Sequence, residues 1–226
     1  MDAATAAIDQ GKQDLPAGDG ANLSLKDRIA RDLGQRILAG TYAQHVVLPT
    51  EAELCVIYGA SRTALRDALL TLSAKGLIEA RKRAGTRVRA SSEWNRLDAQ
   101  VLEWMRDIEP DLDFVRGLIE ARLVIEPAAA QLAARMATAG DLAVIEAAYE
   151  AMRIAPEDDL AACLDADVRF HTAILRASRN PVFANLGNML AAALSFSFRL
   201  TTSATANYQQ TLSAHGDVLE AIRMRR

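Results

Sequence analysis

Cysteine is scarce in this sequence, and other marks of secreted and membrane proteins are missing too. Cys55 and Cys163 are the two cysteines among 226 residues. They are too few and too far apart for a disulfide framework, so we expect reduced thiols and a cytoplasmic protein. No apolar run approaches the roughly 18 residues of a membrane span. The first 22 residues lack the cationic start and apolar centre of a signal peptide. We expect residues 1–23 to form a disordered tail.

Net positive charge is also lacking, because the chain carries a formal net charge of -3. Taken as an average, this value argues against nucleic acid binding. The charge is unevenly divided, however. Residues 24–90 hold 12 lysines and arginines against 6 acidic residues, whereas residues 91–226 hold 13 against 19. The basic part is therefore suited to a polyanion, and the acidic part must do something else.

Residues 48–76 predict two helices joined by a tight turn, supported by a first helix over 24–39. Thr50 and Glu53 are spaced as a capping box, so a helix should begin after Pro49 and run to about Tyr58. Gly59 can take the left-handed conformation that ends it. A second helix should follow, ending at Gly76, with Ser61 as its N-cap and a buried stripe of Leu65, Ala68, Leu69 and Leu72.

Basic residues of this segment have the arrangement of a DNA reader. Arg62 and Arg66 lie one turn apart, beside the buried stripe, and should face outward with Thr63. Such a helix can enter the major groove, where arginine binds O6 and N7 of guanine. A strand over 77–80, a basic turn over 81–85 and a strand over 86–90 predict a β-hairpin wing for phosphates or the minor groove. The expected DNA contacts are Thr50, Glu51, Ser61, Arg62, Thr63, Arg66, Arg81, Arg83, Gly85 and Thr86.

The alternative is a small helical domain whose arginines are merely solvated. The order of cap, stripe, arginine pair and basic hairpin favours the DNA reader. The runs LPTEAEL and GASRTALRDALLTLSAKGLIEARKRAGTRV also resemble the N-terminal winged helix-turn-helix domain of the GntR family of bacterial transcription regulators, over about residues 24–89. Many members of that family carry arginine where this chain has Ala52. That difference narrows the expected contacts to Arg62, Thr63, Arg66 and the wing around Gly85.

Beyond Pro110 the hydrophobic pattern is helical throughout. We expect helices over 112–138, 141–153, 157–178, 182–203 and 207–224, after a hinge and a short helix ending near Met105. The predicted fold is mainly α: a winged helix-turn-helix domain (24–90) with a small β-hairpin wing, a linker (91–106) and an all-α bundle (107–226).

Polar residues interrupt the apolar stripes of two bundle helices. The inner positions of 157–178 should be Leu160, Leu164, Asp167, His171, Ile174 or Leu175, and Ser178. Those of the last helix should be Leu212, His215, Leu219 and Ile222. Asp167, His171 and His215 would then converge as ligands for Zn²⁺, Ni²⁺ or Mn²⁺. Alternatively, each is a hydrogen-bonded core residue, with Asp167 and His171 satisfying each other one turn apart. His45 is expected in a loop.

The bundle resembles the FCD effector-binding domain of the FadR-like GntR branch, over about residues 107–226. The resemblance rests on Asp167-x-x-Phe170-His171, on Ala177-Ser178-x-Asn180-Pro181 and on His215 followed by LEAI after three residues. It implies a metal held by Asp167, His171, His215 and a third histidine on a further helix, which the sequence ending at Arg226 does not include. Water or an effector oxygen could complete the coordination.

The same resemblance implies a small carboxylate effector beside the metal. An inward arginine would suit it, because arginine binds carboxylates in a bidentate geometry. Arg122, aligned with Val115, Leu118 and Ile119, is the first candidate, and a pair with Glu126 is the alternative for that side chain. Arg199 is the second candidate. The segment from Ser92 to Met105 is similar to that of family members controlling sugar-acid catabolism, such as galactonate-type repressors, which implies a sugar acid.

These features together predict a ligand-responsive repressor that binds a pseudo-palindromic operator in double-stranded DNA as a homodimer. One alternative is a metal-dependent hydrolase fused to a DNA-binding module, in which Asp167, His171 and His215 activate a water. The sequence places no obvious general base there and offers no nucleophile motif. Another alternative is an architectural DNA-binding protein without an effector.

Overall fold

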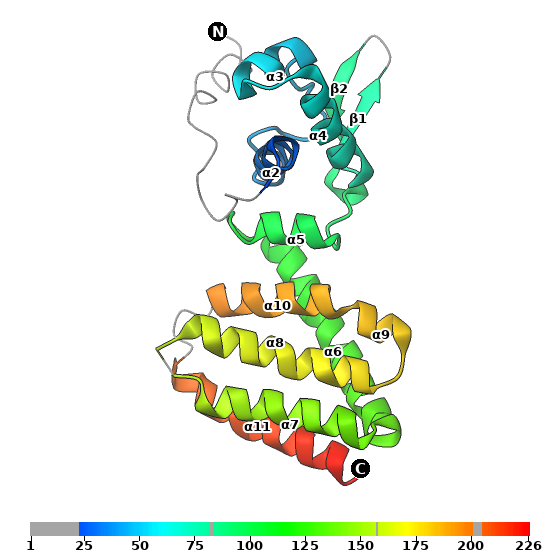
Figure 1. The fold of residues 1–226 in the computed structure, drawn as a ribbon, viewed down its shortest axis with the longest axis vertical. Coiled ribbons are helices and arrows are strands. Elements are labelled where there is room, and N and C mark those ends of the chain that lie inside the picture. Colours follow the sequence, from blue (N-terminus) through cyan, green and yellow to red (C-terminus); the bar gives the residue numbers. More distant parts are fainter. Residues whose placement is uncertain (1–22, 82–83, 157, 201–204) are drawn as a thin grey trace. The chain divides into compact units, whose positions relative to one another are not determined.

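The chain forms two compact units, Met1–Glu109 and Pro110–Arg226, in the computed structural model of Figure 1. The structure describes residues 23–81, 84–156, 158–200 and 205–226, and their side chains except those of 197–200 and 205–211. Residues 1–22 of the expected tail, Arg83 and the side chain of Arg199 lie outside this description. The predicted mainly α fold with a small hairpin is confirmed. Among the described residues, no helix is long and apolar enough to cross a membrane.

The first unit is a set of short helices with one β-hairpin. In chain order its elements are α2 (Leu25–Leu38), α3 (Glu51–Tyr58), α4 (Arg62–Ala74), β1 (Ile78–Arg81), β2 (Gly85–Val88), a 3₁₀ turn (Ser91–Glu93) and α5 (Ala99–Met105). Helix α4 packs on α2 and α3. The predicted stripe of α4 is its buried face: Leu65, Ala68, Leu69 and Leu72.

Local side-chain caps begin α3 and α4 where the sequence predicts them. Thr50 and Glu53 form a complete capping box on α3. The Ser61 hydroxyl accepts a hydrogen bond from the Ala64 amide at the start of α4. Gly59 ends α3 with φ 57°, a left-handed conformation that glycine adopts without steric cost. Together these residues fix the turn that precedes the outward face of α4.

The wing is an antiparallel hairpin in which Ile78 pairs with Val88 and Arg81 with Gly85. Both strands differ by a residue or two from the expected ranges, so Arg81 belongs to β1 rather than to the turn. The segment before α3 joins the same sheet, since Val47 bridges Arg87 and the Leu48 amide donates to the Thr86 carbonyl. These bonds tie the hairpin to the start of the two-helix reader.

Residues 91–106, expected to link the two domains, pack in the structure on the first unit. Helix α5 lies against α2 and buries Val101, Leu102, Trp104 and Met105. Lys75, at the end of α4, is buried and its ammonium lies 2.6 Å from a carboxylate oxygen of Asp98, the N-cap of α5. The Lys75 carbonyl accepts from the Asn95 amide. The segment is therefore held as a part of the first unit.

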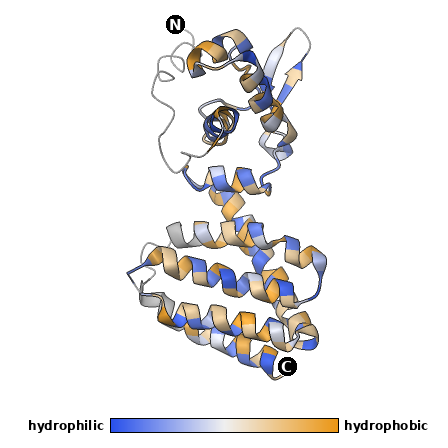
Figure 2. Ribbon diagram, viewed as in Figure 1, coloured by the Kyte–Doolittle hydropathy of each residue, from blue (hydrophilic) through white to orange (hydrophobic). Residues whose placement is uncertain are grey.

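The second unit is an all-α bundle of α6 (Leu112–Met136), α7 (Ala139–Ile154), α8 (Leu160–Ala177), α9 (Pro181–Asn185), α10 (Gly187–Leu200) and α11 (Thr205–Arg223). Helix α8 contacts α6, α7 and α10, and α11 packs on α6 and α7. Figure 2 shows hydrophobic and hydrophilic residues alternating around these helices. The core is rich in alanine on α6 and in larger side chains on α8, among them Phe170, Ile174 and Leu175.

Two expectations for the bundle are wrong. The single helix expected over 182–203 is two helices, α9 and α10, which meet at Leu186. Gly187 begins α10 so close to α8 that a Cβ there would lie 3.2 Å from the Thr172 methyl group. Leu160, which we expected to be buried, is 54% exposed. It is the first residue of α8, and the buried face of that helix begins only at Cys163.

The contact between α2 and α5 depends on Gly34. A Cβ at this position would lie 2.5 Å from Trp104 Cε3 and 2.6 Å from Cζ3. Gly34→Ala should therefore force the indole and α5 away, lowering the free energy of unfolding by about 1–3 kcal/mol. Urea denaturation followed by circular dichroism measures this change.

The matched control is Gly117→Ala in α6, where a Cβ meets nothing within 4 Å. Alanine is the better helix former, so this variant should gain about 0.5–1 kcal/mol. A Gly34→Ala protein as stable as the wild type would contradict the close packing of Trp104.

Candidate functional site

The outward face of α4 carries the residues expected to read DNA. Arg62, Thr63 and Arg66 are all exposed, and the Arg66 side chain keeps 63% of its surface open. The Arg66 Nε donates to Glu51 Oε2 of α3 at 2.9 Å. This bond between the two helices orients the guanidinium along the exposed face of α4. The sequence pointed to both residues as DNA contacts but not to their pairing.

Other expected DNA contacts have local partners. The Thr50 and Ser61 hydroxyls accept backbone N–H groups as helix caps. In the wing, Arg81 lies 2.7 Å from Glu79, and Gly85 takes φ 81° at the turn. The Thr86 carbonyl accepts from Leu48, so this residue helps to position the hairpin. The hydroxyl groups of Thr50 and Ser61 and the Thr86 carbonyl thus have structural partners within the unit.

Asp167, His171 and His215 meet in the interior of the bundle, as their spacing predicts. Asp167 and His171 belong to α8, and His215 comes from α11. Asp167 Oδ1 lies 3.6 Å from His171 Nε2 and 3.2 Å from His215 Nε2, and the two Nε2 atoms are 3.1 Å apart. Asp167 is only 6% exposed. A carboxylate and two imidazole nitrogens therefore face one point.

The spacing of these three atoms fits a metal ion. In a tetrahedral site with bonds near 2.1 Å, ligand atoms lie about 3.4 Å apart. The three distances of 3.1, 3.2 and 3.6 Å match that separation. Two imidazoles with one carboxylate are also a donor set that Zn²⁺, Ni²⁺ and Mn²⁺ accept. Asp167, His171 and His215 thus have both the chemistry and the geometry to hold such an ion.

Glu126 of α6 is a member of this site that the sequence analysis considered only as a partner of Arg122. Its Oε2 lies 2.9 Å from His171 Nδ1, and its Oε1 accepts from Arg122 Nε at 2.5 Å. A carboxylate can only accept, so Nδ1 carries a hydrogen. Once His171 is neutral, the Nε2 lone pair then faces Asp167 and His215. Carboxylate support of this kind is the usual outer shell of a metal-binding histidine.

The buried charges of the cluster set the ionisation of its members. Burial opposes the charged form of Asp167, but hydrogen bonds with His171 and His215 outweigh it and hold the Asp167 pKa below its usual range. Burial likewise opposes the imidazolium of His171, but Asp167 and Glu126 raise its pKa to about 9. Bonds from His171 and Arg122 overcome burial and lower the pKa of Glu126. His171 therefore carries, on Nε2, the proton that a metal ion would displace.

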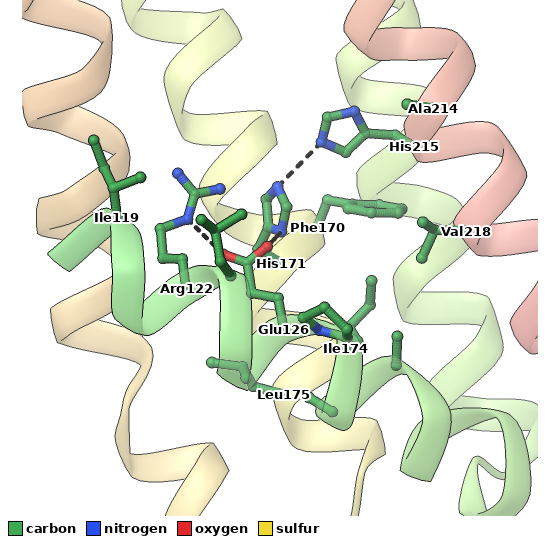
Figure 3. Close-up of a pocket in the computed structure, with 14 residues that line it drawn as sticks. Ile119, Arg122, Glu126, Phe170, His171, Ile174, Leu175, Ala214, His215 and Val218 are labelled. Atoms are coloured by element: carbon green, nitrogen blue, oxygen red, sulfur yellow. Dashed lines mark hydrogen bonds and ion pairs between the residues drawn. The ribbon is translucent and has the colours of Figure 1, made fainter. Parts of the chain in front are cut away.

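The cluster opens into a cavity of about 500 Å³ between α6, α8 and α11. Figure 3 shows Arg122, Glu126, His171 and His215 at this cavity, with Phe170 beside the two imidazoles. The Phe170 ring meets both histidine rings edge to face, at centroid distances of 5.7 and 5.1 Å. Arg122 thus lines the cavity, as we expected of an effector contact. It also pairs with Glu126, which was the alternative interpretation of this side chain.

Comparison with known proteins identifies both units. Residues 25–88 match the family model of the bacterial regulatory proteins, gntR family, and residues 117–226 match the FCD domain. The galactonate operon transcriptional repressor of Escherichia coli (strain K12) is 38% identical over 202 residues, which cover 89% of this chain and 88% of that protein. The chain belongs to the GntR family. It is a DNA-binding transcription regulator with an FCD domain.

Further matches agree with this placement of the GntR-family regulator. The putative L-lactate dehydrogenase operon regulatory protein of Escherichia coli (strain K12) is 35% identical over 160 residues, covering 70% of this chain and 60% of that protein. The solved structure of Lar from Listeria monocytogenes has a TM-score of 0.54 at 20% identity and covers 89% of this chain and 91% of that chain. The likeness to Lar concerns the fold.

Proposed function

We propose that this GntR-family regulator is a repressor that leaves its operator when a small hydroxycarboxylate binds in the FCD bundle. The observation that carries the proposal is the buried cluster of Asp167, His171 and His215, which opens into a cavity that also receives Arg122. This arrangement suits a carboxylate, because the anion can contact both the Arg122 guanidinium and a metal ion held by the cluster.

A divalent metal such as Zn²⁺, Ni²⁺ or Mn²⁺ would be held by Asp167, His171 and His215. When bound, it would supply a Lewis-acidic centre for oxygen ligands of the effector. Glu126 orients His171 by accepting the Nδ1 hydrogen, and it fixes Arg122 through Nε. The terminal nitrogens of Arg122 are directed away from Glu126 in Figure 3. They remain geometrically suited to a carboxylate at the cavity.

The names of the relatives support the class of effector. One is named for a galactonate operon and another for an L-lactate dehydrogenase operon. Galactonate and lactate are both 2-hydroxycarboxylates, which offer adjacent carboxylate and hydroxyl oxygens to a metal. We extend that class to this regulator, which would control a catabolic operon for such an acid.

Operator binding would use two copies of the chain. One recognition helix reads few base pairs, so a two-fold symmetric homodimer on a pseudo-palindrome is the usual source of specificity. Effector binding would favour one arrangement of the DNA-binding units over another and so change operator affinity. This coupling also distinguishes the regulator from an architectural DNA-binding protein.

A metal-dependent hydrolase is not favoured for the same site. Glu126, the carboxylate beside the cluster, is committed to Arg122 and to His171 Nδ1. It therefore serves to orient those two side chains rather than to accept a proton from a water. The family match also gives the bundle a regulatory role.

The protein should protect a pseudo-palindromic site upstream of its own gene in a salt-sensitive footprint. Arg66→Ala should weaken binding to that site by about 1–3 kcal/mol while leaving the fold intact, because it removes a base contact. Fluorescence anisotropy with the footprinted duplex measures the loss.

Arg153→Ala is the matched control. Arg153, like Arg66, is an exposed arginine paired with a glutamate, but it lies on α7 of the bundle. Operator affinity should be unchanged in this variant. An Arg66→Ala protein with wild-type affinity would show that α4 meets the DNA through other residues, and absence of any sequence-specific footprint would contradict the proposed function.

Metal affinity should depend on pH through His171. Its pKa is raised to about 9, so metal binding at neutral pH must release its proton. Affinity for Zn²⁺ should therefore rise by about tenfold for each pH unit between about pH 6 and 8 from this group. Competition with a chromophoric chelator at several pH values measures the slope.

Glu126→Gln is the control for this dependence. The amide oxygen can still accept the Nδ1 hydrogen, but the negative charge that raises the His171 pKa is gone. The rise of Zn²⁺ affinity with pH should therefore become less steep near pH 8, because His171 loses its proton at a lower pH in this variant. A Zn²⁺ affinity in the wild type that is independent of pH would contradict the assignment of His171 as a ligand.

A further inference from the structure

Six acidic residues lie in the basic part of the chain, residues 24–90, which holds the DNA reader. Five of them have partners there. These are Asp27 with the Ser24 hydroxyl, Asp32 with Arg36 and Tyr58, Glu51 with Arg66, Glu53 with Thr50 and Glu79 with Arg81. The sixth is Asp67 of α4, whose carboxylate has no hydrogen bond or ion pair among the described residues.

The position of Asp67 on α4 gives it none of the usual local roles of an acidic side chain. Asp67 is the sixth residue of the helix, so it lies beyond the first turn, where the helix dipole would stabilise it. No cation lies three or four positions away, where the helix has Thr63, Ala64, Leu70 and Thr71. The Thr71 hydroxyl donates to the Asp67 carbonyl and not to its carboxylate.

Asp67 belongs to the exposed face of α4, and this face differs in charge from one edge to the other. Successive residues of an α-helix point about 100° apart. Arg66 and Asp67 therefore project toward opposite edges of the face, and the exposed Thr63 and Leu70 lie between them. Arg62 is one turn before Arg66 and shares its edge. The face thus has guanidinium groups along one edge and a carboxylate on the other.

Such a face complements a G·C base pair in the major groove. Guanine presents the acceptors O6 and N7 there, and cytosine presents the N4 amino donor. Glu51 binds Arg66 at Nε, which leaves the terminal nitrogens for guanine. Arg66 and Asp67 differ by about 1.5 Å along the helix axis, less than the spacing of about 3.4 Å between base pairs. They can therefore contact the same base pair or two adjacent ones.

A carboxylate on this face lowers the affinity for DNA unless a base donor offsets the repulsion by phosphates. We propose that Asp67 is a specificity-determining residue, whose carboxylate accepts the N4–H of one cytosine in each operator half-site. Thymine has the acceptor O4 in place of that amino group, so the carboxylate also excludes thymine. This inference rests on the operator binding of the proposed function and does not involve the metal or the effector.

Operator duplexes in which each base pair of one half-site is changed in turn test the proposal. By fluorescence anisotropy, the wild type should prefer cytosine to thymine at one position. Asp67→Ala should reduce this preference by about tenfold, because a methyl group cannot accept from N4–H. Asp67→Asn should instead shift the preference at that position toward adenine, since an amide binds adenine N6 and N7.

The contact with N4–H needs a double-mutant cycle, because changing cytosine to thymine also replaces the opposite guanine. 2-Pyrimidinone lacks the N4 amino group of cytosine and leaves that guanine in place. Replacing the cytosine by 2-pyrimidinone should weaken binding of the wild type about tenfold more than binding of Asp67→Ala. Equal losses in the two proteins would overturn the inference.

Glu120→Ala is the matched control. Glu120 is an exposed acidic residue of α6 in the bundle, so this variant removes the same charge and leaves α4 unchanged. Its base preferences should equal those of the wild type at every position. If Asp67→Ala instead strengthens binding to every duplex by one common factor, the carboxylate only repels DNA and the inference is wrong.

The outcomes also separate this inference from the proposed function. A wild type that prefers no duplex over another would contradict operator recognition itself. A preference for cytosine that Asp67→Ala retains in full would overturn the role of Asp67 alone. The Asp67→Ala protein should unfold at the wild-type temperature or above, because alanine favours the helix and no side-chain contact is lost. Circular dichroism during heating measures this.

Discussion

A carboxylate buried in the bundle, that of Asp167, is the constraint on which the rest of the FCD unit depends. A buried charge is stable only when donors or cations surround it. His171 on the same helix and His215 on α11 provide them, so α11 must hold one register relative to α8. Glu126 then balances His171, and Arg122 balances Glu126. Negative and positive groups thus alternate from Asp167 in the core to Arg122 at the cavity. The last group of this series is a cation, which suits a bound anion.

The DNA-binding unit is organised by a different kind of contact. Its reading face is exposed, and the Arg66 to Glu51 bond orients a side chain there without burying it. Behind that face, Trp104 against Gly34 and the buried Lys75 beside Asp98 attach α5 to the helices of the reader. A change of orientation of the segment after α5 would therefore act on the reader as a whole. The acidic bundle and basic reader accordingly divide sensing from binding between two units of one chain.

Sequence-local features were predictable, and contacts between distant elements were not. The capping residues Thr50 and Ser61 act within a few positions of themselves, and the stripe of α4 follows from its period. The meeting of Asp167 and His171 with His215 also followed from inward positions on two helices. By contrast, the link from Glu126 to His171 and the burial of α5 depend on how separate helices pack. The bend at Leu186 was missed because the hydrophobic period continues across it, while the close approach of Gly187 to Thr172 is tertiary.

The central claim is that the Asp167 cluster controls the DNA reader through a bound acid. The most direct measurement is the anisotropy of a labelled operator duplex during titration of the regulator–operator complex, in the presence of Zn²⁺, with galactonate and with lactate, for the wild type and for Asp167→Asn. Both proteins should bind the operator equally well without an acid, because Asp167 lies in the bundle. At least one of the two acids should release operator from the wild type and leave the variant bound. Equal release from both proteins would contradict the account.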